Sequence, residues 1–472
     1  MIAVHTAQQV REAEQAFFAA NPGVDLMQRA ADGLAEAVEN FLEGRGPGVD
    51  GARLLVAVGP GNNGGDALFA AARLARLGCR VELWATHGDA HEAGLAEAQA
   101  AGCQQIDAGQ ATTALAEADL LLDGVLGIGG RPGLDAPVAT LAREARDLGI
   151  PVVAVDLPSG LDADSSTPAE ESFHATLTVT FGALKPCHVL QPAASRCGEV
   201  RLVDIGLELG EPWALAAAPG DIAQRWPLPG PTSDKYSRGV VGIDTGSVHY
   251  PGAAVLGTVG ALHAGAGMIR FCGPGPADGL IRAALPSVTH GEGRVQAWLV
   301  GSGWGDEPGD AERLAGRLAD GLPTVVDADA LRLLPDHLPA GCLLTPHAGE
   351  LARLLDVERE EVTADPIGHA RAAADRWQAV VLLKGATQYV VQPDGAVWLA
   401  VPGPHWSAQA GSGDVLAGIC ATLLAAGLDA ARAALLGASV QAMAARRRPG
   451  PYPPDDIARE VPAVVGGFEV VR

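Results

Sequence analysis

The chain has 472 residues, of which 48% are hydrophobic, and a formal net charge of −23. A chain of this length exceeds one ordinary hydrophobic core, so two or more domains are expected, and its apolar content excludes a disordered protein. The negative charge argues against nucleic acid or an anionic membrane as a partner. The negative charge does not exclude small anionic ligands, because glycine loops and helix N-termini bind phosphate locally.

The cysteines and the N-terminal residues indicate the cellular compartment in which the protein works. Seven cysteines occur without a Cys-x-x-Cys pair, which is typical of reduced thiols in a cytoplasmic protein. Arg11, Glu12 and Glu14 interrupt any apolar targeting segment. The longest apolar run, residues 415–428, is too short to span a bilayer. We therefore expect a soluble, cytoplasmic protein with no membrane partner.

The first half of the chain alternates predicted helices and strands. Helices are predicted over residues 6–20, 26–42 and 94–101, and strands over residues 53–58, 81–85, 120–123, 151–156 and 176–181. The loop GPGNNGGD, residues 59–66, follows the first strand and opens a helix to about residue 77. This order predicts a Rossmann-like, three-layer αβα domain with a parallel sheet.

Three polar loops follow strands of this predicted sheet, around Asn63, Asp123 and Ser159. The carboxyl ends of parallel strands meet at one edge of a sheet, so we expect these side chains to lie close together. The loop at residues 59–66 offers amide and carboxylate oxygens, which suit a hard cation or a ribose. A tight turn with left-handed Asn residues is the alternative.

GPGNNGGD, the glycine loop at residues 123–132 and DLPSGLD at residues 156–162 resemble, in this order, the NAD(P)HX epimerase family of NAD(P)H-hydrate repair proteins. The resemblance covers about residues 6–206. It implies that Asn63, Asp123 and Ser159 hold a potassium ion and that Asp123 is catalytic. Ala67 and Ile128 stand where the family usually has Gly and Thr, so Ile128 removes a hydroxyl. The resemblance implies that these residues contact the hydrated dinucleotide: Asn62, Asn63, Gly64, Gly65, Asp66, Gly127, Ile128, Gly129, Gly130, Arg131, Pro132, Gly133 and Asp156.

Residues 212–231 are rich in Pro, Ala and Gly, which predicts a linker between an N-terminal domain, residues 1–211, and a C-terminal domain, residues 232–472. Beyond it, strands are predicted over residues 240–244, 297–300, 324–326, 343–345 and 380–383. Each of these strands leads into a polar or glycine-rich loop, so this half is also α/β.

The last glycine loop, Gly411-Ser412-Gly413-Asp414, enters the apolar helix predicted at residues 415–428. Unpaired N–H groups and the helix dipole at such an N-terminus bind a phosphoryl group. Asp414 would oppose a bound phosphate, so we expect it to take a proton from an attacking hydroxyl. A simple N-capping turn is the alternative.

YPGAA, DADAL, TPHAGE, LKGA and GSGDVLAG, in this order, resemble the ADP-dependent NAD(P)H-hydrate dehydratase family, which has a ribokinase-like fold. The resemblance covers about residues 232–445 and implies that Mg²⁺ bridges the phosphates. Bulky His405-Trp406, Ala410 and Gln441 depart from the residues usual in the family. The residues implied at the hydrate site are Ala253, Gly303, His347 and Asp414. The residues implied to hold ADP are Lys384, Gly385, Ala386, Thr387, Gln388, Gly411, Ser412 and Gly413.

Together the two resemblances predict a bifunctional repair enzyme. Its N-terminal domain would epimerise R and S NAD(P)HX, and its C-terminal domain would dehydrate the S epimer with ADP. A homo-oligomer is expected. A ribokinase-like small-molecule kinase fused to a non-catalytic nucleotide-binding domain is the alternative, and it would consume ATP and leave a stable phosphorylated product.

Overall fold

The computed structural model describes residues 1–45 and 48–469. The chain divides into two compact units, one of residues Ala3–Trp213 and one of Met1–Ile2 together with the chain from Ala214 onward. Among the described residues, no helix is both long and apolar enough to cross a membrane. Each unit is α/β, which confirms the predicted fold class.

The N-terminal unit contains a parallel sheet in the order β4-β3-β2-β5-β6-β7-β8. Its strands are β2 (Arg53–Val58), β3 (Arg80–Ala85), β4 (Gln104–Ile106), β5 (Leu120–Gly124), β6 (Val152–Val155), β7 (Leu177–Phe181) and β8 (Glu199–Val203). Its helices are α1 (Ala7–Ala20), α2 (Leu26–Arg45), α3 (Asn62–Arg76), α4 (Glu92–Ala100), α5 (Ala108–Glu117), α6 (Ala136–Leu148), α7 (Pro186–Val189) and η1 (Ala193–Arg196).

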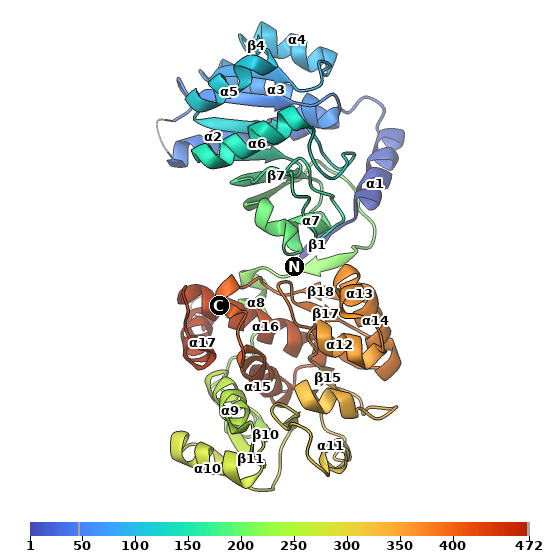
Figure 1. Ribbon diagram of the computed structural model, residues 1–472, viewed down its shortest axis with the longest axis vertical. Coiled ribbons are helices and arrows are strands. Elements are labelled where there is room, and N and C mark those ends of the chain that lie inside the picture. The colour runs from blue at the N-terminus through green and yellow to red at the C-terminus, as the bar shows by residue number, and fades with distance from the viewer. Residues whose placement is uncertain (46–47, 470–472) are drawn as a thin grey trace. The chain divides into compact units, whose positions relative to one another are not determined.

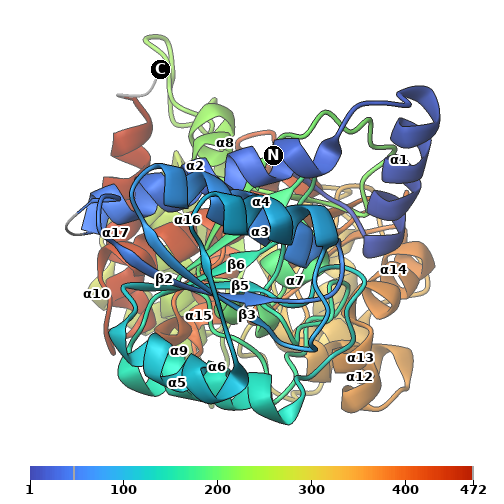
Figure 2. The ribbon, with the colours of Figure 1, turned by 90° about the horizontal axis from the view of Figure 1, so that it is seen from above.

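This sheet is covered on both faces, which is why its strands are apolar throughout. Leu54 and Val56 on β2 pack in one core with α2 and α3, whereas Leu55 and Ala57 pack in a second core with α5 and α6. Figure 2 shows α2, α3 and α4 on one face of the sheet and α5 and α6 on the other. The carboxyl ends of the strands stay open between these layers, and the loops that carry the predicted site residues lie there.

The C-terminal unit is built on a sheet in the order β1-β9-β18-β17-β16-β15-β14-β13-β10-β11-β12, in which β17 is antiparallel to both of its neighbours. Its strands are β1 (Ile2–Val4), β9 (Ala214–Ala216), β10 (Val240–Asp244), β11 (Met268–Phe271), β12 (Thr289–His290), β13 (Ala297–Val300), β14 (Thr324–Val326), β15 (Leu343–Leu344), β16 (Val380–Leu383), β17 (Tyr389–Val391) and β18 (Val397–Leu399).

Helices cover both faces of this sheet as well. The helices are α8 (Pro219–Arg225), α9 (Pro251–His263), α10 (Gly275–Ala284), α11 (Asp310–Leu318), η2 (Ala328–Leu333), α12 (Ala348–Leu355), α13 (Arg359–Ala364), α14 (Pro366–Trp377), η3 (His405–Ser407), α15 (Ser412–Ala425), α16 (Ala430–Arg447) and α17 (Pro454–Glu469). Figure 1 shows α9, α15, α16 and α17 on one side of the strands and α11, α12 and α14 on the other.

Two helices, α9 and α15, pack with their backbones in contact. A Cβ atom at Gly418 would lie 2.0 Å from the carbonyl oxygen of Gly257, and one at Gly260 would lie 2.2 Å from that of Val415. Only glycine permits this approach, because any side chain would overlap the opposite backbone. The close packing fixes the position of α15 and, with it, the glycine loop at the N-terminus of that helix.

The segment 212–231, for which the sequence predicts a linker, differs in the structure. It contains β9, which pairs in parallel with β18, and α8. Ile222 and Trp226 are buried in the core of the C-terminal unit. These two side chains are four residues apart and so lie on one face of a helix, a pattern that the Pro, Ala and Gly content of the segment hides.

Candidate functional site

In the N-terminal unit, a cavity of about 480 Å³ lies at the carboxyl edge of the sheet, and we call it the Asp156 cavity. The loops after β2 and β5, the residue after β6, and Lys185 after β7 form its wall, together with Val10, Arg11 and Glu14 from α1. The predicted dinucleotide residues in its lining are Asn62, Asn63, Asp66, Gly127, Ile128, Gly129, Gly130 and Asp156.

Other predicted contacts lie outside this lining. Gly64 and Gly65 are buried in the first turn of α3, where a Cβ at Gly64 would lie 2.0 Å from the carbonyl oxygen of Gly59. Their role is to let the glycine loop close on the helix. Arg131 and Pro132 are exposed, and the guanidinium of Arg131 pairs with Asp135. Gly133 has a φ of +85°, which only glycine adopts easily, and it serves the turn.

A buried ion pair faces the Asp156 cavity. Nζ of Lys185 donates to Oδ1 of Asp156 at 2.6 Å and to Oγ1 of Thr180 at 2.8 Å, and the Lys185 side chain is only 1% exposed. Burial, the largest single influence, would raise the pKa of Asp156, but the charge and hydrogen bond of Lys185, helped by His188 and Thr180, together hold that pKa below its usual value. Asp156 is therefore ionised.

Asp66 lines the same cavity, and its pKa is shifted in the opposite direction from that of Asp156. Burial raises the pKa of Asp66 well above its usual range, and the negative charges of Asp156 and Glu14 raise it further. The pKa of Glu14 is also raised, first by burial and then by Asp156. One cavity thus holds two carboxyl groups whose pKa values are shifted in opposite directions, down for Asp156 and up for Asp66, which is the arrangement that acid–base chemistry needs.

Asp123, for which the sequence predicts a catalytic role, lies elsewhere. It is fully buried beneath the loop at residues 125–130 and is outside the lining of the cavity. The N–H of Ser159 donates to its Oδ2 at 2.8 Å and the hydroxyl of Ser159 to its Oδ1 at 2.6 Å. Burial raises the pKa of Asp123 to about 6, and the bonds from Ser159 limit that rise. The hydrogen bonds that hold Asp123 in the core keep it from the cavity.

Asn63 connects this buried pair to the cavity. It lines the Asp156 cavity, and its amide nitrogen is buried with no hydrogen-bond partner in the described structure. Gly124 is the residue after Asp123. A Cβ atom added to Gly124 would lie 3.3 Å from the backbone oxygen of Asn63. The backbone of Asn63 therefore lies beside the strand end that carries Asp123, and one polar atom of the Asn63 side chain is left unsatisfied.

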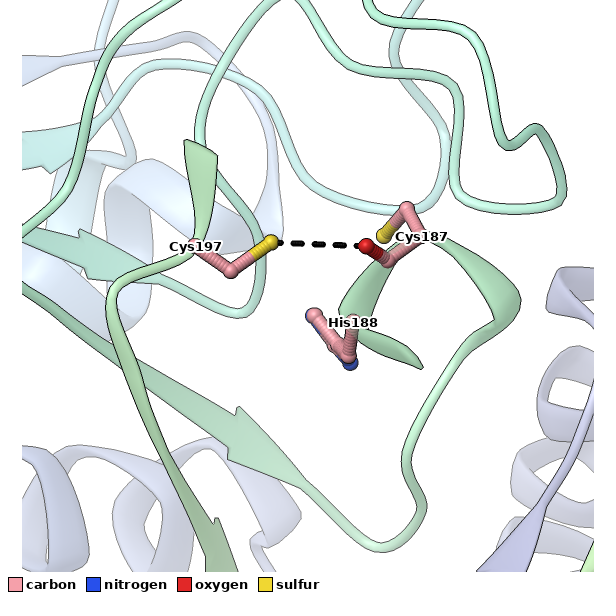
Figure 3. Close-up of side chains that lie close together, drawn as sticks. All are labelled: Cys187, His188 and Cys197. Carbon is pink, nitrogen blue, oxygen red and sulfur yellow. Dashed lines mark hydrogen bonds between the residues drawn. The ribbon is translucent and has the colours of Figure 1, made fainter. Parts of the chain in front are cut away.

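Cys187, His188 and Cys197 form a buried cluster whose ligand-type atoms lie within 4.8 Å of one another (Figure 3). The imidazole is fully used, since Nδ1 accepts from the N–H of Lys185 at 3.0 Å and Nε2 donates to the carbonyl of Asp156 at 2.9 Å. The thiol of Cys197 lies 3.5 Å from the carbonyl of Cys187. His188 therefore secures both members of the ion pair rather than offering a lone pair to a metal.

The C-terminal unit has two cavities that meet at the glycine loop before α15. The Lys384 cavity, about 520 Å³, is lined by Lys384 and by residues 407–413. The Asp414 cavity, about 980 Å³, is lined by Asp414, Ala253 and Gly303. Ala410 and Gly411 line both cavities. A group bound in one cavity therefore faces a group bound in the other across the first turn of α15.

The Lys384 cavity gathers most of the residues predicted to hold a nucleotide. Those in its lining are Lys384, Gly385, Ala386, Gln388, Gly411, Ser412 and Gly413. A Cβ on Gly413 would lie 3.2 Å from Nζ of Lys384, so the ammonium group sits directly beside the amide cradle. Thr387 is the exception, because its side chain is buried and outside the lining. Gln441 also lines this cavity and donates to the carbonyl of Ser412 at 2.8 Å.

Charge around Asp414 sets its proton affinity. Burial raises the pKa of Asp414 to about 7, and Asp327, Asp329 and Glu350 add to the rise while Lys384 opposes it. For Lys384, burial lowers the pKa, but Asp327 and Glu350 outweigh burial and raise it. The lysine therefore keeps its charge, and Asp414 exchanges a proton near neutral pH.

His347, predicted to contact the hydrate, is not on the Asp414 cavity. It lines the Lys384 cavity and caps α12, where its Nδ1 accepts from the N–H of Glu350 at 3.1 Å. The N–H of His347 in turn donates to Oε2 of Glu350 at 2.8 Å. The pattern His-x-x-Glu is a capping box, and that local pairing turns the imidazole away from the Asp414 cavity.

Sequence reasoning did not assign Arg11, Glu14 and Lys185, which line the Asp156 cavity, or Asp327, which pairs with Lys384 of the Lys384 cavity. Arg11 and Glu14 come from α1, far from the loops in sequence, and only tertiary packing reveals them. Asp327 directly follows β14, as Lys384 follows β16, and Lys185 lies shortly after the end of β7 at Phe181. Their position at strand ends is the signal that could have identified them.

Comparisons with known proteins identify the families that this chain resembles. Residues 241–461 match the family model for NAD(P)H-hydrate dehydratase, and residues 23–187 match that for the YjeF-related protein N-terminus. A bifunctional NAD(P)H-hydrate repair enzyme from Mycobacterium tuberculosis is 42% identical over 91% of this chain and 90% of its own length. One from Mycobacterium leprae is 41% identical over 95% and 94%.

Solved structures also resemble the C-terminal unit. The ADP/ATP-dependent NAD(P)H-hydrate dehydratase from Bacillus subtilis, co-crystallised with ATP/Mg²⁺, has a TM-score of 0.52 at 24% identity, and it covers 54% of this chain and 99% of that one. A ribokinase-like superfamily protein from Enterococcus faecalis has a TM-score of 0.50 at 19% identity, and it covers 55% and 98%. These similarities confirm the predicted ribokinase-like fold of this unit.

Proposed function

Because this chain belongs to the family of bifunctional NAD(P)H-hydrate repair enzymes, we propose that its Asp156 cavity epimerises NAD(P)HX and that its Asp414 and Lys384 cavities dehydrate the S epimer with ADP. The observation that carries the second assignment is the meeting of two cavities at Ala410 and Gly411. A hydroxyl bound beside Asp414 can thereby reach a phosphoryl group bound beside Lys384.

The dehydration begins with proton transfer to Asp414. This carboxylate takes the proton of the C6 hydroxyl, and the oxygen attacks the terminal phosphoryl group of ADP. The bond from phosphorus to AMP breaks as the new P–O bond forms, so AMP leaves with the electron pair. N–H groups of the loop Gly411–Gly413 and the ammonium of Lys384 stabilise the negative charge.

Loss of phosphate completes the reaction. Phosphate leaves C6 with the electrons of the C–O bond, and a proton leaves the neighbouring ring carbon, which restores the dihydronicotinamide. Phosphate departs far more readily than hydroxide, so the phosphoryl group of ADP makes the elimination possible. The positive end of the α15 dipole also favours the anionic leaving group.

In the epimerisation, Asp66 acts as the general acid and Asp156 stabilises the positive charge. Protonated Asp66 donates to the C6 hydroxyl, which leaves as water while the ring nitrogen supplies electrons. Water then returns to the opposite face of the ring carbon and gives its extra proton back. Ionised Asp156, held by Lys185, stabilises the cationic ring between these events.

Two cations would assist these reactions. Asn63, whose buried amide nitrogen has no hydrogen-bond partner among the described residues, would hold K⁺ together with the buried pair of Asp123 and Ser159. Such an ion would supply a fixed positive charge under the cavity floor. Mg²⁺ would neutralise the phosphate charge of ADP in the Lys384 cavity, whose described lining itself offers no carboxylate.

Return of NADH absorbance tests the function. The full chain is incubated with ADP and S-NADHX, and then with ADP and pure R-NADHX. We expect NADH and AMP from both epimers. A stable phosphorylated product formed with ATP would instead support a kinase, and no NADH from the R epimer would mean that the N-terminal unit is not an epimerase. The expectation of a homo-oligomer stays a prediction, which light scattering tests.

A further inference from the structure

A third cavity in the C-terminal unit, about 310 Å³ in volume, adjoins the Asp414 cavity, and we call it the arginine cavity. Arg332 from η2, Arg353 from α12 and Arg376 from α14 line it. Asp329 and Arg332 line both the arginine cavity and the Asp414 cavity, so the two are contiguous. Three cationic side chains from three separate elements therefore meet at the far end of the site for the dinucleotide.

Two of these arginines carry charge that the protein does not neutralise. Nε of Arg353 donates to the carbonyl of Gly349 at 3.1 Å, and the guanidinium of Arg376 lies 4.5 Å from the ring centre of Trp377. Within the described residues, neither Arg353 nor Arg376 forms an ion pair. Arg376 also donates to the carbonyl of Leu354 at 3.5 Å. In a chain with a net charge of −23, two guanidinium groups on one cavity that bond only to neutral groups of the described structure favour an anionic ligand.

The two carboxylates on the same lining are already engaged. Oε2 of Glu350 accepts from the N–H of His347 and lies 4.0 Å from Nζ of Lys384, so its charge is offset. Oδ2 of Asp329 accepts from the N–H of Gly305 at 2.9 Å, which holds this carboxylate at the junction of the two cavities. A carboxylate in such a place can accept a hydrogen bond from a ribose 3′-hydroxyl, which stays free when the 2′-oxygen carries a phosphate.

We propose that the arginine cavity binds the adenosine end of the hydrated dinucleotide and that Arg353 and Arg376 hold its 2′-phosphate. This inference rests on the proposed dehydratase function. The reacting ring lies beside Asp414, the ribose meets Asp329 at the junction, and the phosphate meets guanidinium groups whose planar fork matches phosphate oxygens. Leu331, Leu334 and Leu354 supply the apolar part of the wall for the base. The dehydratase therefore prefers NADPHX to NADHX.

Steady-state kinetics on the full chain test this preference. KM and kcat are measured at saturating ADP for S-NADPHX and for S-NADHX, in the wild type and in the double variant Arg353→Gln, Arg376→Gln. We expect the KM for NADPHX to rise about tenfold or more, because two charged phosphate contacts are lost. The KM for NADHX and both kcat values stay within about twofold. Arg371→Gln, an exposed arginine on the same helix α14, is the matched control and leaves all four constants unchanged.

Loss of folding is checked separately, because Arg376 also packs on Trp377. Arg353→Gln alone, whose side chain bonds only to the carbonyl of Gly349, should reproduce part of the NADPHX effect at an unchanged Tm. An equal rise in KM for both substrates, or no rise for either, would overturn the proposal. A wild type that returns no reduced coenzyme from either substrate would instead refute the dehydratase function itself.

Discussion

The ammonium group of Lys384 lies 2.7 Å from Oδ1 of Asp327, and these two residues directly follow the parallel strands β16 and β14. Thr345 and Ser302 also donate to the carboxylate of Asp327, at 2.7 and 2.8 Å. Asp327 is thus a fully engaged, buried anion beside the nucleotide site. Its charge keeps Lys384 protonated and raises the pKa of Asp414, so one residue tunes both the cation and the base.

Replacement of Asp327 by Asn should move the pH dependence of dehydration. The base form of Asp414 is required, and its pKa is raised to about 7, so kcat/KM rises with pH through that value. Without the charge of Asp327, the pKa of Asp414 falls and the acid limb of the profile moves down by about one pH unit or more. Asp336→Asn, at an exposed position, is the control. If the acid limb of the kcat/KM profile stays at the same pH or moves to higher pH, Asp327 does not raise the pKa of Asp414.

Replacement of Asp66 by Asn should abolish epimerisation and leave dehydration unchanged. Removal of the general acid lowers the rate of R-to-S conversion roughly a hundredfold or more. In the wild type, this rate should fall as pH rises past the raised pKa of Asp66, because the ionised form cannot donate. Chiral chromatography of R-NADPHX follows the conversion, and dehydration of the S epimer is the internal control. Asp89→Asn, at an exposed turn, should have no effect on either reaction. Normal conversion by the Asp66 variant would exclude it as the acid.

Replacement of Asp156 by Asn should destabilise the N-terminal unit. The substitution leaves the ammonium of Lys185, which is 1% exposed, without its anionic partner, and such a loss costs about 3 kcal/mol. Urea unfolding monitored by circular dichroism measures the change. The double variant Asp156→Asn, Lys185→Met removes the unpaired charge and should regain part of the stability. If the single variant loses under about 1 kcal/mol, the pair is not a buried ion pair of this kind.

Two glycine-to-alanine substitutions should have opposite effects on stability. Gly418→Ala inserts a methyl group against the backbone of Gly257 and should cost about 2 kcal/mol or more. Gly466→Ala, in α17 with open space around its Cβ position, should stabilise the protein by about 0.5 kcal/mol. Thermal unfolding of both variants measures the difference. Equal stabilities would mean that α9 and α15 do not pack backbone to backbone.

Much of the fold could be predicted because its signals are local. Apolar strands that end in glycine loops, such as β2 before Asn62 and Asn63, reveal a parallel sheet and the edge where ligands bind. The glycine loop before α15 likewise identifies the phosphate cradle from sequence alone. The helix itself begins at Ser412 rather than at 415, since the small residues of the loop already adopt helical conformations.

Other parts of the sites depend on packing that a sequence does not display. Asp123 lies at the end of β5 and Asp156 follows β6, yet Ser159 holds Asp123 in the core while Asp156 lines the cavity, and no local pattern distinguishes the two. His347 follows a strand but is drawn into a capping box by Glu350. Glu14 reaches the Asp156 cavity only because α1 packs across it. Strand ends predict which loops form a site, whereas tertiary contacts decide which side chains face the ligand.

In the proposed dehydration, Asp414 activates the hydroxyl of the hydrate for attack on ADP. The sharpest test of this role is the ADP-dependent return of NADPH absorbance from S-NADPHX by the full chain with Asp414→Asn. We expect this rate to fall roughly a hundredfold or more, with R-to-S epimerisation by the same sample unchanged. Dehydration by this variant at the wild-type rate would show that Asp414 is not the base.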